Sequence, residues 1–177
     1  LIAFRIGWLK GYQAKERVLA RFLKGVDSEK IFEKGEAFTQ EILPKYLRKE
    51  ALDRLAWHQR KGHTCFLVTA SPSFWTLSFA NQQRLTLLST LPLIRNGIFT
   101  GRIEGKNNKG PEKVNRLEKA LASYEVRERF AYGDSRGDTP FFGGSANHAT
   151  FRLAKSSNEY GSFSAKSFHS FSSLSHL

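Results

Sequence analysis

The sequence has no methionine and a single cysteine, Cys65, among its 177 residues. One cysteine cannot form an intramolecular disulfide or a cysteine-rich metal site, so we expect a reducing, cytoplasmic compartment. No apolar run approaches the roughly 20 residues that a membrane-spanning helix needs. The alternative to a freely cytoplasmic protein is one that is peripheral to the inner membrane. Because a chain without methionine cannot begin at its own initiator, we expect this one to be a fragment.

Acidic residues are also scarce, with 16 Asp and Glu against 28 Lys and Arg, which gives a formal net charge of +12. A strongly basic protein attracts anions, including phosphate esters, anionic lipid head groups and nucleic acids. Its cations are dispersed along helical segments, which is typical of a solvated face (Lys10, Lys15, Arg17, Arg21, Lys24, Lys30, Lys34). No aromatic RNA-binding signature or zinc spacing accompanies them. We therefore expect no specific nucleic-acid binding, and weak association with an anionic membrane surface stays open.

Two carboxylates, Asp134 and Asp138, follow the short apolar stretch 130–133. Hard cations such as Mg²⁺ take oxygen ligands, and ligands of open α/β sheets lie beyond the carboxyl ends of the strands. The pattern predicts a magnesium site at a strand end. The alternative is an ordinary polar turn in which Asp138 caps the next helix.

An apolar run at 64–68 predicts a strand of a parallel sheet that is buried on both faces. It is followed by Thr69, Ala70, Ser71 and Pro72, and we expect Ser71 to cap a helix with Pro72 in its first turn. The free backbone N–H groups of such a turn bind anions. These residues are therefore candidates for binding a phosphate.

A second helix start is predicted at Pro111, which places Lys113 in the opening turn. A cation at a helix N-terminus opposes the helix dipole, so this position suits a lysine that reaches for a phosphate. A surface lysine is the alternative. Lys109, just before the helix, is a second candidate for the same role.

The remaining segments indicate helices first and strands later. Residues 12–24 and 28–48 have apolar residues at helical spacing, with Val18, Leu19, Phe22 and Leu23 on one face of the first helix and a kink or break at Pro44. Asn96-Gly97 predicts a hairpin within residues 85–103. Residues 148–153 suggest a final edge strand, and the serine-rich residues 156–177 are expected to be disordered.

The order of these motifs, with Thr69 after a strand, Lys113 at a helix start and Asp134 with Asp138 after another strand, resembles the haloacid dehalogenase-like superfamily of hydrolases. Within it the chain resembles subfamily IB, the branch of phosphoserine phosphatase. Four segments look closest to the C-type phosphatidylglycerophosphatases (residues 49–58, 67–72, 96–103 and 110–114). The resemblance implies an α/β fold, a three-layer Rossmann-like parallel sheet with an inserted helical cap. It also implies domains at 1–48 for the cap region, 49–155 for a partial core and 156–177 for the tail.

The family's chemistry uses an aspartate nucleophile, which becomes an aspartyl-phosphate, together with Mg²⁺. By resemblance, Thr69 and Lys113 are the catalytic residues that neutralise the transferring phosphoryl group, and Ala70, Ser71 and Lys109 are further phosphate-binding candidates. Asp134 and Asp138 would hold the metal. The family's first motif, Asp-x-Asp-x-Thr after a strand, does not occur in the sequence. Asp27 and Asp53 are the only unassigned aspartates, and both lie in helical surroundings.

We therefore expect the full-length parent to be a magnesium-dependent phosphomonoester hydrolase that acts on a small-molecule or lipid-linked ester. The chain as given lacks the N-terminal strand with the nucleophile, so it is expected to be inactive. The alternative is a non-catalytic fragment that binds phosphate without turning it over. A basic nucleic-acid-binding protein is the weaker third interpretation, and it would require a salt-dependent affinity.

Overall fold

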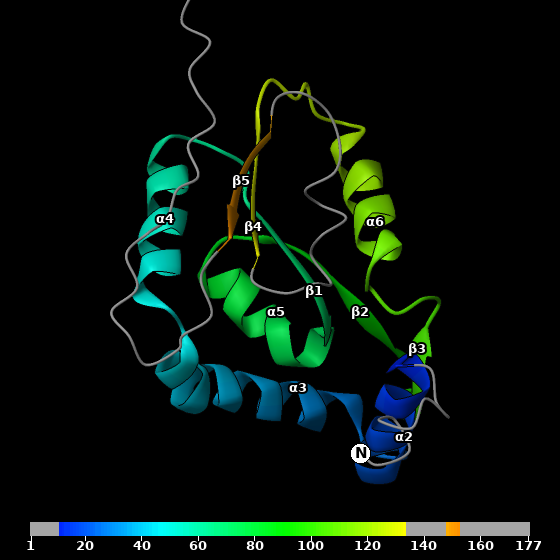
Figure 1. Cartoon of the computed structure of the whole chain (residues 1–177). Coiled ribbons are helices and arrows are strands. Elements are labelled where there is room, and N and C mark those ends of the chain that lie inside the picture. The colour runs from blue at the N-terminus through cyan, green and yellow to red at the C-terminus, as the bar shows by residue number, and fades with distance from the viewer. Residues whose placement is uncertain (1–10, 134–147, 153–177) are drawn as a thin grey trace, which may run out of the picture. The chain divides into compact units, whose positions relative to one another are not determined.

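The computed structural model describes residues 11–133 and 148–152. The chain divides into two compact units, Leu1–Val126 and Arg127–Leu177. The described part of the first unit begins with helices and continues with a three-stranded sheet, and the second unit contains a pair of strands (Figure 1).

Two helices open the described part of the first unit, α2 (Gly11–Leu23) and α3 (Ser28–Ala37). Helix α3 begins where it does because the Asp27 carboxylate accepts the backbone N–H of Glu29 at 2.8 Å, which satisfies a donor that has no partner within the helix. Asp27 is thus a helix cap, in agreement with its helical surroundings in the sequence.

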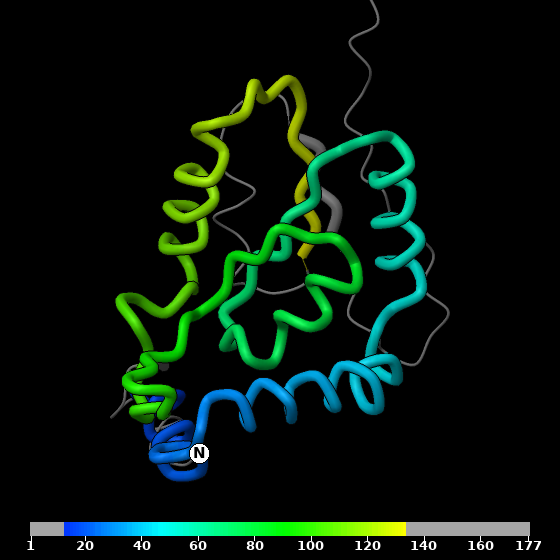
Figure 2. The backbone as a smooth tube through the Cα atoms, turned by 180° about the vertical axis from the view of Figure 1, so that it is seen from behind, coloured from blue at the N-terminus to red at the C-terminus, as the bar shows by residue number. Residues whose placement is uncertain are grey.

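The chain then changes direction through a π-helical turn, η1 (Phe38–Ile42), and a 3₁₀ turn, η2 (Leu43–Tyr46), before α4 (Lys49–Arg60) (Figure 2). Pro44 lies in the first turn of η2. Proline has no N–H to continue an α-helix, so the predicted break at Pro44 is confirmed.

A mixed sheet follows, in the strand order β1-β2-β3. Strand β1 (Phe66–Pro72) runs parallel to β2 (Thr86–Arg95), and α5 (Ser73–Gln82) connects them. Strand β3 (Ile98–Glu104) returns antiparallel to β2 through Asn96 and Gly97, whose φ angles are 49° and 76°. Positive φ at both central residues is what a tight hairpin turn requires, so the predicted hairpin is confirmed.

Strand β1 lies at the edge of this three-stranded sheet, and its residues from Phe66 to Ala70 are only half-buried. The prediction of a strand buried on both faces is therefore wrong for this unit. The apolar sequence of β1 is consistent with its parallel pairing with β2. As an edge strand, however, β1 has a neighbouring strand on one side only, which leaves it more exposed to solvent than a central strand.

The apolar core of the first unit lies where α2 packs on β3 and α3 packs on α5 (Leu19, Ile31, Phe74, Phe99 and Ile103). Helix α2 approaches β3 so closely that a Cβ on Gly101 would lie 3.0 Å from Ala20. Only part of the predicted apolar face of α2 is used, because Val18 is 57% exposed and Phe22 is 73% exposed.

Helix α6 (Pro111–Leu121) completes the first unit and packs against β1 and β2. In the second unit, β4 (Arg129–Gly133) pairs in parallel with β5 (His148–Arg152), from Arg129 opposite His148 to Gly133 opposite Arg152. Both predicted strands are confirmed. The α/β class is confirmed as well, with β1–β2 and β4–β5 as its parallel pairs.

The cap, core and tail boundaries stay predictions, and residues 156–177 lie outside the described residues. Within the described ranges, no helix has both the length and the apolar character needed to cross a membrane.

Candidate functional site

A local hydrogen bond joins Thr69 and Ser71 at the carboxyl end of β1. The Ser71 N–H donates to Thr69 Oγ1 at 3.1 Å, and β1 continues to Pro72. Helix α5 therefore begins at Ser73 with Pro72 in the capping position, and no side chain caps it. The expectation that Ser71 caps this helix is wrong, because β1 continues through Ser71 and the helix begins two residues later, at Ser73.

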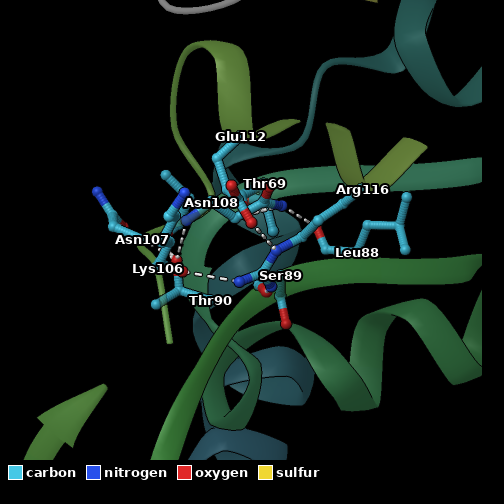
Figure 3. A network of polar contacts seen from close by, with 10 residues as sticks. Thr69, Leu88, Ser89, Thr90, Lys106, Asn107, Asn108, Glu112 and Arg116 are labelled. Carbon is cyan, nitrogen blue, oxygen red and sulfur yellow. Dashed lines mark hydrogen bonds and ion pairs between the residues drawn. The ribbon is translucent and has the colours of Figure 1, made fainter. Parts of the chain in front are cut away.

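The Asn108 side chain joins β1 to β2 where their regular pairing is interrupted. The strands are in register at Val68 opposite Leu88, and the register shifts before Pro72. The Asn108 amide Nδ2 donates to the Thr69 carbonyl at 3.0 Å and to the Leu88 carbonyl at 2.6 Å (Figure 3). Asn108 thus supplies the donors that the interrupted pairing leaves out, and it fixes the backbone at Thr69.

Thr90, which is 0% exposed, continues this network from β2. Its hydroxyl lies 2.8 Å from the Ala70 carbonyl and 3.0 Å from Asn107 Oδ1, and it accepts the Asn108 N–H at 3.0 Å. The loop before α6 is thereby tied to the end of β1 through both Asn107 and Asn108. Ala70 and Thr69 are held by their carbonyl groups, so their backbone positions do not depend on the strand pairing alone.

A lysine from the helical segment reaches the same place. Lys15, on α2, donates to the Ala70 carbonyl at 2.5 Å and to Asn107 Oδ1 at 2.6 Å. Burial, and to a smaller extent the positive charge of Lys109, lower the pKa of the Lys15 ammonium. The two lysines are therefore close enough to repel each other.

Helix α6 begins at Pro111, as predicted, after Gly110 with φ 59°. Lys113 is its third residue, donates its N–H to the Gly110 carbonyl at 3.1 Å and is only 8% exposed. A lysine is rarely buried to this extent. This burial argues against the alternative of a surface lysine, and the role of Lys113 toward a phosphate stays a prediction.

Arg116, one turn further along α6, fixes this helix to β2. Its guanidinium donates to the Ser89 carbonyl at 2.6 Å, to the Lys106 carbonyl at 2.7 Å and to Glu112 Oε1 at 3.0 Å (Figure 3). The hydrogen bond from Arg116 lowers the pKa of the Glu112 carboxyl. The helix that carries Lys113 is thus held to β2 through the Ser89 carbonyl and to the preceding loop through the Lys106 carbonyl.

The structure brings together the Thr69–Ser71 turn and the helix that carries Lys113, with Lys109 exposed on the loop before that helix. Asp134 and Asp138 lie outside the described residues. Among the residues that are described, no group of three His, Cys, Asp or Glu side chains could hold a metal ion. Asp53 forms an exposed ion pair with Lys49 at 2.7 Å, one helical turn away.

Sequence reasoning missed the polar residues that build this site (Lys15, Thr90, Asn107, Asn108 and Arg116). The only local signal was the pair Asn107-Asn108 immediately before a helix start. Lys15 and Arg116 look like ordinary helix-surface cations in the sequence. Their roles come from contacts with distant segments.

The family model described as haloacid dehalogenase-like hydrolase matches residues 2–143. The chain is 33% identical over 141 residues to Protein CicA of Caulobacter vibrioides, an alignment that covers 78% of this chain and 63% of that protein. The chain thus spans less than two thirds of the length of this curated relative.

Among solved structures, one similar protein is a protein of unknown function from Bordetella pertussis. It has a TM-score of 0.70 and 31% identity, and the match covers 78% of this chain and 65% of that one. A probable phosphoserine phosphatase from Vibrio cholerae has a TM-score of 0.64 and 17% identity, with 86% and 46% coverage. A hydrolase from Salmonella enterica serovar Typhi has a TM-score of 0.60 and 19% identity, with 78% and 46% coverage. At such identities the last two show a shared fold.

Proposed function

The chain belongs to the haloacid dehalogenase-like hydrolases, and we propose that it forms the phosphate-binding part of a magnesium-dependent phosphomonoester hydrolase of the phosphoserine phosphatase-like branch, subfamily IB. The observation that supports this best is the buried Lys113, on a helix packed against the strand that carries Thr69. An ammonium group in a place with little solvent acts on a nearby anion more strongly than one in water.

In this proposal, Thr69 and Lys113 neutralise the oxygens of the transferring phosphoryl group. Thr69 Oγ1 accepts the Ser71 N–H, so the hydroxyl proton is left to be donated to a phosphate oxygen. Lys113 provides a full positive charge. Donors that are fixed before the reaction are effective because they need no reorganisation when charge develops.

Asp134 and Asp138 are the residues that would hold Mg²⁺. Their carboxylate oxygens are the ligands this ion prefers, and Asp134 comes directly after the last residue of β4 in the sequence. When bound, the ion would supply further positive charge to the transferring oxygens.

The aspartyl-phosphate step of the family belongs, in this proposal, to a longer protein that contains the Asp-x-Asp-x-Thr motif. Residues 1–177 contain no such motif. The carboxylates proposed as metal ligands cannot serve as the nucleophile without giving up the metal, and among the described residues no base contacts the Thr69 hydroxyl. The second candidate function, phosphate binding without turnover, follows for the chain alone.

The proposed substrate is a small-molecule or lipid-linked phosphate monoester. The net charge of +12 favours any anion at long range. It therefore also supports weak association with an anionic membrane surface, but no specific contact with nucleic acid.

A binding measurement tests the phosphate site directly. We expect isothermal titration calorimetry with orthophosphate and Mg²⁺ to show at least a roughly 10-fold weaker affinity for Lys113→Met, because a hydrogen bond to a charged group contributes about 1.5 to 3 kcal/mol. Lys119→Met is the matched control, since Lys119 lies exposed in the last turn of the same helix. Equal affinities for Lys113→Met and the unaltered chain would contradict the proposal.

A second measurement separates hydrolysis from binding. We expect the 177-residue chain to release no more phosphate from a chromogenic ester than its Asp134→Asn variant does. An N-terminally extended protein that contains the nucleophile motif should release phosphate only with Mg²⁺ and with Asp134 intact. Turnover by the chain alone, above the Asp134→Asn level, would show that a nucleophile lies within these residues.

A further inference from the structure

Helix α2 buries one face and exposes two large apolar side chains on another. Its buried face packs on β3, where a Cβ on Gly101 would lie 3.0 Å from Ala20 (Figure 1). On the exposed side, Val18 is 57% exposed and Phe22 is 73% exposed. Because they are four residues apart, they form one apolar stripe along the helix. Single exposed apolar residues are common on protein surfaces, so the side chains beside this stripe decide its meaning.

The charged side chains that α2 exposes are all positive. Arg17, Arg21 and Lys24 are exposed, and their helical spacing places them on one face, next to the apolar stripe. Glu16 is the one acidic residue of α2. It is half-buried, and its carboxylate accepts the Ile103 N–H at 3.1 Å, on β3. The exposed side of α2 is therefore both apolar and cationic.

No other α-helix within residues 11–133 combines these two properties. The exposed charged residues of α3, α4 and α6 include both signs, and α5 exposes no charged residue. In the sequence, residues 1–10 have a composition like that of the exposed side of α2, since they include Arg5, Lys10, several apolar residues and no acidic residue. A solvated surface typically mixes charges of both signs. The composition of α2 thus favours a partner that is itself anionic.

An anionic lipid surface fits both parts of this face. Its head groups attract Lys and Arg, and the boundary between head groups and acyl chains takes up the apolar side of a surface-bound helix. Long basic side chains keep their charge among the head groups while their methylene stems cover apolar surface. A second copy of the chain would set like charges against each other, and a nucleic acid would give the apolar stripe no partner.

We propose that α2 docks on an anionic lipid surface, with Val18 and Phe22 inserted below the head groups and Arg17, Arg21 and Lys24 among them. This inference rests on the weak membrane association included in the proposed function, and it assigns that association to one surface. Docking holds the protein where a lipid-linked phosphate ester lies, so it favours the lipid-linked member of the proposed substrate class.

Vesicle sedimentation of the 177-residue chain tests this surface. The probes are vesicles of phosphatidylcholine alone and of phosphatidylcholine mixed with phosphatidylserine. We expect partitioning onto the anionic vesicles to be stronger by on the order of 100-fold, because each of the three cations contributes about 5-fold. High salt should remove most of this difference. Equal partitioning onto both kinds of vesicle, or none onto either, would overturn the proposal.

Charge variants separate this face from the general attraction of a basic protein. Arg21→Glu should weaken partitioning onto the anionic vesicles by roughly 10-fold or more, because it replaces an attracted charge with a repelled one. Lys119→Glu is the matched control, since it changes the net charge equally on α6, which packs against β1 and β2, whereas α2 packs against β3. Screening should keep its effect within about 3-fold. Equal losses for the two variants would overturn the proposal.

Phe22→Ser tests the insertion of the apolar stripe. It should weaken partitioning by roughly 10-fold, because the burial of a Phe side chain is lost. Tyr46→Ser, at an aromatic side chain of η2 that is 75% exposed, should leave partitioning unchanged. Both side chains are exposed, so both variants should fold, which circular dichroism checks. Unchanged partitioning of Phe22→Ser would show that charge alone attracts the chain, and the proposal would be wrong.

Two further measurements separate this inference from the alternatives. An N-terminally extended protein with the nucleophile motif should partition with the same dependence on Phe22, and loss of partitioning there would mean that the added residues cover this face. Analytical ultracentrifugation that finds a dimer which Phe22→Ser abolishes would assign the face to a second copy. Either result would overturn the lipid surface.

The phosphate site is tested independently of this surface. Arg21→Glu and Phe22→Ser should leave the affinity for orthophosphate unchanged. If the chain binds orthophosphate through Lys113 but ignores anionic vesicles, the lipid surface is wrong and the proposed phosphate site stands. If Lys113→Met leaves the orthophosphate affinity unchanged while partitioning still depends on Arg21 and Phe22, the phosphate site is wrong and the lipid surface stands.

Discussion

The first unit contains two groups of buried side chains with opposite chemistry, an apolar core between the helices and β3 and a polar network at the carboxyl end of β1. Phe99 in the core is 1% exposed, and Asn108 in the network is 0% exposed. Burial of an aromatic side chain stabilises the folded state by a few kcal/mol. A buried amide gains little net free energy, because its hydrogen bonds replace those that it made to water.

The difference indicates what each region does. The apolar core holds α2, α3 and α5 on the sheet, and any well-fitting apolar set would serve that purpose. The network instead fixes particular backbone groups, the Thr69 and Ala70 carbonyls, at the strand end. Departures from an all-apolar interior are expected at functional sites, and four substitutions test this division.

Phe99→Ala should give the largest loss of stability. Its ring lies between β3 and α5, 5.9 Å from the Phe74 ring in an edge-to-face arrangement. Truncation of a buried phenylalanine typically costs about 3 to 5 kcal/mol in free energy of unfolding. Urea denaturation measures this cost, and Phe22→Ala, at a side chain that is 73% exposed, is the control with a change within about 0.5 kcal/mol. Similar losses for both variants would refute the location of the core.

Gly35→Ala should destabilise the same region through overpacking. A Cβ on Gly35 would overlap the Phe74 carbonyl oxygen, so α3 and α5 would have to move apart. Overpacking of this kind costs about 1 to 3 kcal/mol, sometimes more. Gly62→Ala separates this effect from backbone strain, because Gly62 has φ 73° and open space around it. A smaller loss at Gly35 than at Gly62 would show that the two helices are not in close contact.

Asn108→Leu should lower the free energy of unfolding less than Phe99→Ala does, but it should weaken phosphate binding more. The substitution leaves the Thr69 and Leu88 carbonyls without their donor, which costs about 1 to 3 kcal/mol. It should also weaken orthophosphate binding, because Thr69 is no longer fixed. Asn81→Leu, on the exposed surface of α5, is the control for both readouts. Unchanged phosphate affinity in folded Asn108→Leu would mean that the network has no positioning role.

Ser89→Ala should have the smallest effect and the opposite sign. The Ser89 hydroxyl is buried and has no hydrogen-bond partner in the described structure, so its removal should raise the free energy of unfolding by up to about 1 kcal/mol. Thermal unfolding measures the change, with Ser123→Ala at an exposed position as the control. A clear loss of stability would show that the hydroxyl does have a partner.

Local sequence signals were sufficient for much of the fold. Asn96-Gly97 adopts the positive φ angles of a tight turn, Pro111 begins α6, and Pro44 lies in the 3₁₀ turn η2, where the helical segment breaks. Each of these depends on the backbone preferences of one or two residues, which neighbours along the chain do not change. Ser71 is the exception, because β1 continues through it to Pro72 and α5 begins only at Ser73.

Only the tertiary structure decided how the site is held together. Asn108 bonds Thr69 across 39 residues, Lys15 bonds Ala70 across 55, and Lys15 bonds Asn107 across 92. Nothing in the spacing of an amphipathic helix distinguishes Lys15 from the solvated lysines around it. The sequence by itself determined which residues are candidates for binding phosphate, since that depends on their chemistry and on their place in the chain. Which cation stands beside them depends on how α2 packs on β3, and that is a property of the folded chain.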